Sequence, residues 1–163
     1  IIVLALPKIQ ILTKDARDIL PDVVNMKNFV GNMANACLIA SAFSTDNYKL
    51  FSRSLKDIVI EPVRSKLIPG FDDVKAIALE AGADGMTISG AGPAVFAITN
   101  SNENAPSIEA AMKNAFNDIN IECTTLITSP CTEGTKIVDT NIFSILCKRV
   151  AENEVEYGWE WYK

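Results

Sequence analysis

Gly85-Met86-Thr87-Ile88-Ser89-Gly90-Ala91-Gly92-Pro93, followed by the apolar run Ala94–Thr99, is the stretch that decides the fold of this chain. Two short apolar segments joined by a glycine-rich connection predict a β-hairpin. The two glycines of the connection allow backbone conformations that other residues avoid, and they let another group approach the main chain closely. The connection is therefore either a structural turn or a loop beside a ligand.

The elements around this hairpin predict the rest of the architecture. The apolar run Ile1–Leu6 is typical of a central strand, and the alternation over Ile121–Thr128 predicts a last strand. Helical periodicity and capping residues predict the helices 14–20, 25–44, 45–64 (bent or broken at Pro62), 71–81 and 106–117. The order is that of an α+β, ferredoxin-like βαββαβ antiparallel sheet with extra helices in the first crossover, and the helices should stack mainly on one face.

Length, charge and cysteine content restrict the class of protein. The 163 residues suit one main domain, and a net charge of −5 disfavours a nucleic-acid-binding surface. No apolar run is long enough to span a bilayer, so we expect no membrane association. Cys37 and Cys123 are expected to be buried free thiols, which fits a reduced, cytoplasmic setting. The absence of histidine excludes Ser-His-Asp and Cys-His catalysis.

Three blocks of sequence, together with the glycine connection, resemble one family. The blocks are Thr13-Lys14-Asp15-Ala16-Arg17 with Leu20-Pro21; Asp57-Ile58-Val59-Ile60-Glu61-Pro62-Val63-Arg64 with Ile68-Pro69-Gly70; and Gly82-Ala83-Asp84-Gly85 with Ile88–Pro93. In this order they resemble the C-terminal half of the homoserine kinase family, which belongs to the GHMP small-molecule kinases. The resemblance runs from residue 1 to about Val138.

The resemblance implies both a fold and a reaction. It implies the GHMP kinase C-terminal domain over residues 1–138, with 139–163 a tail of unknown role that includes Trp159 and Trp161. It implies a transferase that moves the ATP γ-phosphoryl to the hydroxyl of L-homoserine in threonine biosynthesis. ATP and Mg²⁺ would then serve the complete enzyme. Because the family's phosphate-binding loop lies in an N-terminal half that this sequence lacks, we expect the chain alone to be inactive and to bind no cofactor tightly.

The resemblance also implies site residues. Arg17 and Arg64 stand where the family places arginines that bind the substrate carboxylate, and Arg suits a carboxylate because its guanidinium can donate two parallel hydrogen bonds. Thr13 is either near the substrate, as in the family, or a helix N-cap. The loop Ser89, Gly90, Ala91 and Gly92 would lie beside the phosphate loop and offer backbone N–H groups to it. A solvated surface charge or an ordinary turn remains the alternative for each of these residues.

Further polar residues carry less specific signals. Asp57 and Glu61, four apart on the expected helix 45–64, would share a face and could hold Mg²⁺ or act as a base, but pairing of Glu61 with a nearby Lys or Arg is favoured. Asn32 and Asn35 are polar on an otherwise apolar helix. The stripe Met33, Cys37 and Ala40 is expected to be core.

Two other function classes remain open at this point. The chain could be a free-standing amino-acid-binding regulatory domain of ferredoxin-like fold, or an oligomerisation domain without a ligand. A homo-oligomer is compatible with any of the three. The paired arginine motifs and the glycine connection favour the kinase, because a regulatory domain would not need them.

Overall fold

The core of the fold is one antiparallel sheet. The computed structural model describes residues 1–130, in which four strands lie in the order β2-β3-β1-β4. These are β1 (Ile2–Pro7), β2 (Gly85–Ile88), β3 (Val95–Ile98) and β4 (Cys123–Thr128). Ile2 lies opposite both Ile98 of β3 and Thr128 of β4, so the apolar first strand is central, as predicted.

The glycine-rich connection closes a β-hairpin. Strands β2 and β3 pair antiparallel, with Ile88 opposite Val95 at the end next to the connection. Beyond that pair, the Ser89 N–H donates to the Ala94 carbonyl (2.8 Å) and the Gly92 N–H to the Ser89 carbonyl (3.1 Å). The predicted hairpin is thus confirmed, and its loop is held by its own backbone hydrogen bonds.

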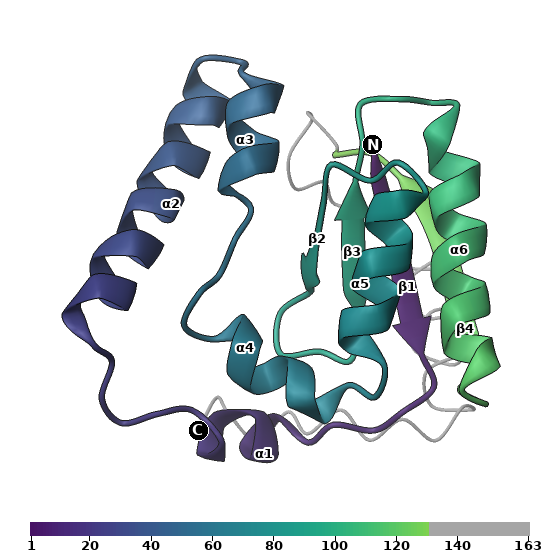
Figure 1. Ribbon diagram of the computed structural model, residues 1–163, viewed down its shortest axis with the longest axis horizontal. Coiled ribbons are helices and arrows are strands. Elements are labelled where there is room, and N and C mark those ends of the chain that lie inside the picture. The colour runs from purple at the N-terminus through teal and green to yellow at the C-terminus, as the bar shows by residue number, and fades with distance from the viewer. Residues whose placement is uncertain (131–163) are drawn as a thin grey trace, which may run out of the picture. The chain divides into compact units, whose positions relative to one another are not determined.

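Two helices cover one face of the sheet. Helices α5 (Phe71–Glu80) and α6 (Asn104–Asp118) lie side by side over it (Figure 1). Ile108, Met112 and Phe116 recur every four residues along α6 and are fully buried, because this spacing puts all three on one side of the helix. They pack on the sheet side that carries Val3 and Ala5, which are also fully buried. The expected βαββαβ layering is confirmed.

The first crossover contains the extra helices. They are α1 (Thr13–Asp18), α2 (Met26–Ser44), α3 (Tyr48–Ser54), α4 (Glu61–Arg64) and the 3₁₀ turn η1 (Ser65–Leu67). Helices α2 and α3 pack as an antiparallel pair (Figure 1). The Tyr48 hydroxyl donates to the Asp84 carboxylate (2.7 Å), which fastens α3 to the start of β2. Burial, together with this bond, raises the pKa of Tyr48 above its usual value.

The expected single helix over 45–64 is wrong. Helix α3 ends at Ser54, residues 55–60 are not helical, and Pro62 lies in the first turn of α4 instead of bending a longer helix. Side chains satisfy the backbone of this irregular segment. The Asp57 carboxylate accepts hydrogen bonds from the Val59 and Ile60 N–H groups (2.9 and 2.8 Å). Asp57 and Glu61 therefore do not share a helix face.

The two asparagines of α2 support the same segment. The Asn32 side-chain oxygen accepts from the Ile58 N–H (3.0 Å), and the Asn35 amide donates to the Lys56 carbonyl (2.9 Å). Such bonds replace those that a continuous helix would have made. The polar positions on this apolar helix are thus explained by the loop that crosses it.

The expected burial of the Met33, Cys37 and Ala40 stripe is also wrong. Met33 is 51% exposed, and Cys37 and Ala40 are exposed as well; of the two cysteines that the structure describes, only Cys123 is buried. The helical period correctly indicated that α2 has an apolar side. It did not indicate that the neighbouring α3 would leave that side uncovered within residues 1–130.

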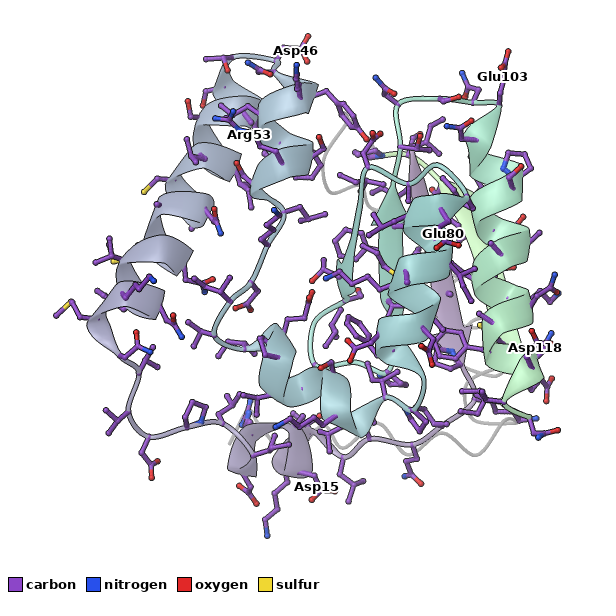
Figure 2. The ribbon with its side chains drawn as sticks, viewed as in Figure 1. Asp15, Asp46, Arg53, Glu80, Glu103 and Asp118 are labelled. Atoms are coloured by element: carbon purple, nitrogen blue, oxygen red, sulfur yellow. The ribbon has the colours of Figure 1, made fainter. Side chains whose placement is uncertain are left out.

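Charged side chains mark the ends of several elements. Asp46 lies in the turn between α2 and α3, Glu80 and Asp118 end α5 and α6, and Glu103 precedes α6; all are exposed (Figure 2). Within residues 1–130 no helix is long and apolar enough to cross a membrane. The predicted domain boundary at Val138, the tail 139–163 and its tryptophans lie outside the described residues.

Candidate functional site

The glycine loop 89–92 is one side of the candidate site. Gly90 and Gly92 have φ angles of +61° and +86°, in the left-handed region that favours glycine, and the Gly92–Pro93 peptide bond is cis. The two glycines differ in their surroundings. A Cβ at Gly92 would stand 3.3 Å from the Ile68 Cδ1, whereas a Cβ at Gly90 would meet no atom within 4 Å. The loop is therefore packed against the domain at Gly92 and open at Gly90.

Arg64 connects this loop to α1. Its Nε donates to the Ala16 carbonyl (3.0 Å), and its Nη1 makes a longer contact with the Gly90 carbonyl (3.4 Å). The Arg64 side chain is half-buried. Three segments that lie far apart in the sequence, α1, α4 and the glycine loop, thus meet around one guanidinium group.

Arg17 and Thr13 lie on the same short helix as Ala16. Arg17 directly follows Ala16 and is exposed. Thr13 is the first residue of α1 and is exposed; the N-cap position belongs to Leu12, which makes no capping bond. The interpretation of Thr13 as an N-cap is therefore wrong, and its proximity to a substrate stays a prediction.

Glu61 is held by two partners on other elements. Its carboxylate binds the Lys75 ammonium of α5 through Oε1 and accepts a hydrogen bond of 2.5 Å from the Thr87 hydroxyl of β2 through Oε2. Pairing of Glu61 with a basic residue was the favoured interpretation and is confirmed. The hydrogen bond to Thr87 was not predicted, because nothing in the sequence indicates which strand faces α4.

The described part of the chain contains no metal-binding cluster, and the hollow beside α4 is lined by other residues. Within residues 1–130, no three acidic, histidine or cysteine side chains come close enough to hold a metal ion. An open, mainly apolar hollow of about 270 Å³ lies beside α4, lined by Pro21, Val23, Val24, Asn25, Asn28, Ile58, Val59, Pro62 and Val63. None of the predicted site residues lines it.

A model of a known family covers the centre of the chain. Residues 39–118, from the middle of α2 to the end of α6, match the family "GHMP kinases C terminal". This match includes α4 with Arg64 and the whole β-hairpin with its glycine loop. The chain belongs to the GHMP kinases. The fold described above is the C-terminal domain of that family.

The chain is similar to several homoserine kinases. It is 39% identical to the homoserine kinase of Chlorobium phaeobacteroides over 134 residues, which is 81% of this chain and 42% of that protein. It is also 39% identical to the homoserine kinase of Pyrococcus abyssi, over 78% of this chain and 42% of that protein. The crystal structure of homoserine kinase from Cytophaga hutchinsonii superimposes with a TM-score of 0.80 at 39% identity, over 84% of this chain and 44% of the other.

The GHMP kinase chain thus spans less than half the length of the relatives that it matches. The resemblance found in the three sequence blocks is confirmed, and so is the fold that it implied. The roles of Arg17, Arg64, Thr13 and the loop 89–92 stay predictions. The structure brings Arg64, the loop and the main chain beside Arg17 together, and it adds Lys75 and Thr87, which sequence reasoning missed.

Proposed function

We propose that this chain is the substrate-side domain of a homoserine kinase, which transfers the ATP γ-phosphoryl group to the hydroxyl oxygen of L-homoserine. In this reaction the bond between the γ-phosphorus and the β–γ bridging oxygen breaks, a bond to the homoserine oxygen forms, and the hydroxyl proton leaves to solvent or to a base. ADP and O-phosphohomoserine are the products. The observation that carries the proposal is the junction of α1, α4 and the glycine loop at Arg64, because each of these segments lies in one of the blocks resembling the family.

Arg64 and Arg17 would bind the substrate carboxylate. The Nε of Arg64 is occupied by the Ala16 carbonyl, so a carboxylate would approach the two terminal nitrogens end-on. The 3.4 Å contact from Nη1 to the Gly90 carbonyl is long enough to be exchanged for a charge-assisted bond, which is shorter and stronger. Binding of the substrate would then release the Gly90 carbonyl and change the hydrogen bonding of the glycine loop.

The remaining requirements for phosphoryl transfer would be met outside this chain. Catalysis of this reaction depends mainly on positioning the phosphates and stabilising their charge. On the basis of the resemblance, we assign Mg²⁺ and most contacts to ATP to the N-terminal part of the complete enzyme. The loop 89–92 would border that part, with the open side of Gly90 facing the phosphates. We expect a cytoplasmic enzyme of threonine biosynthesis.

The chain alone should not phosphorylate homoserine, whereas a chimeric enzyme should. The chimera joins the N-terminal part of the Cytophaga hutchinsonii homoserine kinase to residues 1–138 of this chain, and ATP consumption is followed in a coupled assay. The chimera should turn over L-homoserine at roughly 1–100 per second, the usual range for kinases, with little turnover of L-serine or L-threonine. The 163-residue chain should be at least a hundredfold slower.

Three results would contradict the proposal. One is a folded chimera that consumes ATP with none of these amino acids. A second is a chimera that prefers another alcohol. A third is turnover by the isolated chain within a hundredfold of the chimera, which would mean that ATP binds to residues present here. Tight binding of an amino acid by the isolated chain, with no turnover in the chimera, would favour the regulatory-domain alternative.

A further inference from the structure

Glu61 is the centre of a half-buried polar cluster that joins three elements. One carboxylate oxygen binds the Lys75 ammonium of α5, and the other accepts from the Thr87 hydroxyl of β2. The side chain of Glu61 is 12% exposed and that of Lys75 is 29% exposed. An ion pair at this depth loses less strength to solvent screening than one on the surface. A second ion pair, Lys8–Glu122, has side chains 76% and 73% exposed and provides a contrast.

This cluster fixes one end of α4, and Arg64 fixes the other. The helix has only four residues, too few to be stable by itself, so its position depends on what holds its ends. Glu61, its first residue, is bound to β2 and α5. Arg64, its last residue, is bound to the carbonyls of Ala16 and Gly90. The helix therefore lies as a short bridge between the sheet and the candidate site.

Thr87 extends the same connection to the glycine loop. It lies in β2 two residues before Ser89, where the loop begins. A single carboxylate thus sets the distance between the strand that leads into the loop and the helix that carries Arg64. The loop and the guanidinium also touch each other directly, through the Gly90 carbonyl. The two contacts close a ring of connected residues: Glu61, Thr87, the loop and Arg64.

We propose that Glu61, with Lys75 and Thr87, is a positioning residue that holds Arg64 and the loop 89–92 at the spacing needed to bind the substrate carboxylate. Its effect on the substrate rests on the proposed function; its effect on Arg64 and the loop does not. Glu61 acts through Arg64, and it touches neither substrate nor phosphate itself. The same carboxylate would otherwise be an ordinary structural ion pair, and the experiments below separate these two roles.

The first experiment measures the loop in the 163-residue chain, without any substrate. Backbone amide exchange is followed by NMR in the unmodified chain and in Glu61→Gln, Thr87→Val, Thr87→Ser and Glu122→Gln. The Ser89 and Gly92 amides, both hydrogen-bonded within the loop, and the Arg64 amide of α4 should exchange about tenfold faster in Glu61→Gln and Thr87→Val. Thr87→Ser keeps the hydroxyl and should restore slow exchange. Glu122→Gln, the same chemical change in the exposed pair, should have no effect on these amides.

Amides buried in α6, such as that of Phe116, report global opening in the same samples. If they accelerate as much as the loop amides, Glu61 stabilises the whole domain and the positioning role is overturned. Unchanged loop amides in both Glu61→Gln and Thr87→Val overturn it as well. Thr87→Val is nearly isosteric with threonine, so it tests the proposal even if loss of the Glu61 charge unfolds the chain.

The second experiment is a double-mutant cycle in the chimeric kinase. Glu61→Gln should raise the KM for L-homoserine about tenfold, the scale expected for losing a hydrogen bond to a charged group, while the KM for ATP stays within about twofold. In an Arg64→Lys background the same substitution should add less than about twofold, because two residues that act as one unit are not additive. Independent, additive effects would overturn action through Arg64.

The two experiments separate failure of this inference from failure of the proposed function. If the loop amides of the 163-residue chain respond to Glu61→Gln but the chimera has no kinase activity, the positioning of Arg64 is supported and the homoserine site is refuted. If the chimera is active and Glu61→Gln leaves its KM for homoserine unchanged, the proposed kinase function is supported and the positioning role is refuted.

Discussion

The Arg64 guanidinium donates from Nε to the Ala16 carbonyl at 3.0 Å, across 48 positions of the chain. A main-chain atom of α1, the helix that also carries Arg17, therefore orients the Arg64 guanidinium group. A main-chain acceptor cannot be removed by substitution at position 16, so the orientation depends on where α1 lies. The candidate site is thus assembled by the packing of α1 against α4 as well as by the two arginines.

Replacing either arginine by lysine should weaken homoserine binding in the chimeric kinase. Arg17→Lys and Arg64→Lys each keep the positive charge but lose the planar fork that matches a carboxylate. Each should lower kcat/KM for homoserine by about 1.5–3 kcal/mol, the value of a hydrogen bond to a charged group, mostly through a raised KM. The KM for ATP should hardly change. Steady-state kinetics with both substrates varied is the measurement.

Arg53→Lys is the matched control for these two variants. Arg53 lies exposed on α3 and is labelled in Figure 2. It should leave both KM values unchanged. Arginine variants that behave like this control would exclude Arg17 and Arg64 from substrate binding, and the carboxylate would have to be bound elsewhere. Arg64→Lys should also lower the melting temperature, since it loses the bonds to two carbonyls.

Thr13→Ala should have little effect on the stability of the chain. Since Thr13 makes no capping hydrogen bond, the substitution should change the free energy of unfolding by less than about 0.5 kcal/mol. Asn25→Ala removes a true cap, in which the Asn25 side chain accepts from the Asn28 N–H (2.8 Å), and should cost about 1 kcal/mol. Urea unfolding of the chain measures both. A Thr13→Ala cost as large as that of Asn25→Ala would indicate a structural contact at position 13.

Gly90→Ala and Gly92→Ala should differ in stability although both glycines have positive φ. At Gly90 the new methyl group meets open space, so only backbone strain of about 1–2 kcal/mol is expected. At Gly92 the methyl group would also stand 3.3 Å from the Ile68 Cδ1, a tighter contact than usual, so the loss should be larger. Denaturant unfolding compares the two. Equal losses would mean that the loop relaxes away from Ile68 at no cost.

The two cysteines that the structure describes should react at different rates. Cys37 is exposed on α2, whereas Cys123 is buried at the start of β4 and burial raises the pKa of its thiol. Because the thiolate is the reactive form, both lack of access and the raised pKa protect Cys123. Iodoacetamide labelling with peptide mass spectrometry at neutral pH should modify Cys37 first. Faster labelling of Cys123 would contradict the burial of its side chain.

Local signals were the ones that sequence reasoning interpreted correctly. The hairpin of β2 and β3 depends on residues within fifteen positions, and the central place of β1 follows from an unbroken apolar run. The helix predicted over 45–64 failed in part because two bonds that satisfy the irregular segment come from Asn32 and Asn35, more than twenty positions away. Asp57, within the segment itself, supplies two more. The predicted burial of the α2 side chains was wrong for a related reason. Helical periodicity defines an apolar face, but it does not show which element, if any, covers that face.

The same difference between local and long-range signals applies to the residues of the candidate site. The residue types of Arg17, Arg64 and the loop 89–92 were recognisable because they lie in compact sequence blocks. The partners of Glu61 were not, because Lys75 and Thr87 are brought to it by the packing of α5 and β2 against α4. Residues that touch a ligand often stand in recognisable motifs, whereas the residues that hold them in place are distributed over the fold.

The central position of β1 has a consequence for how the protein is made on the ribosome. Strand β1 precedes both of its neighbours: it pairs with β3, residues 95–98, and with β4, residues 123–128. A growing chain must therefore carry this apolar strand unpaired until about 90 further residues have left the exit tunnel, and both sides of the strand are covered only when β4 emerges. Contacts of such long range also slow folding. The strand around which the sheet forms is thus the segment that a nascent-chain chaperone would have to shield longest.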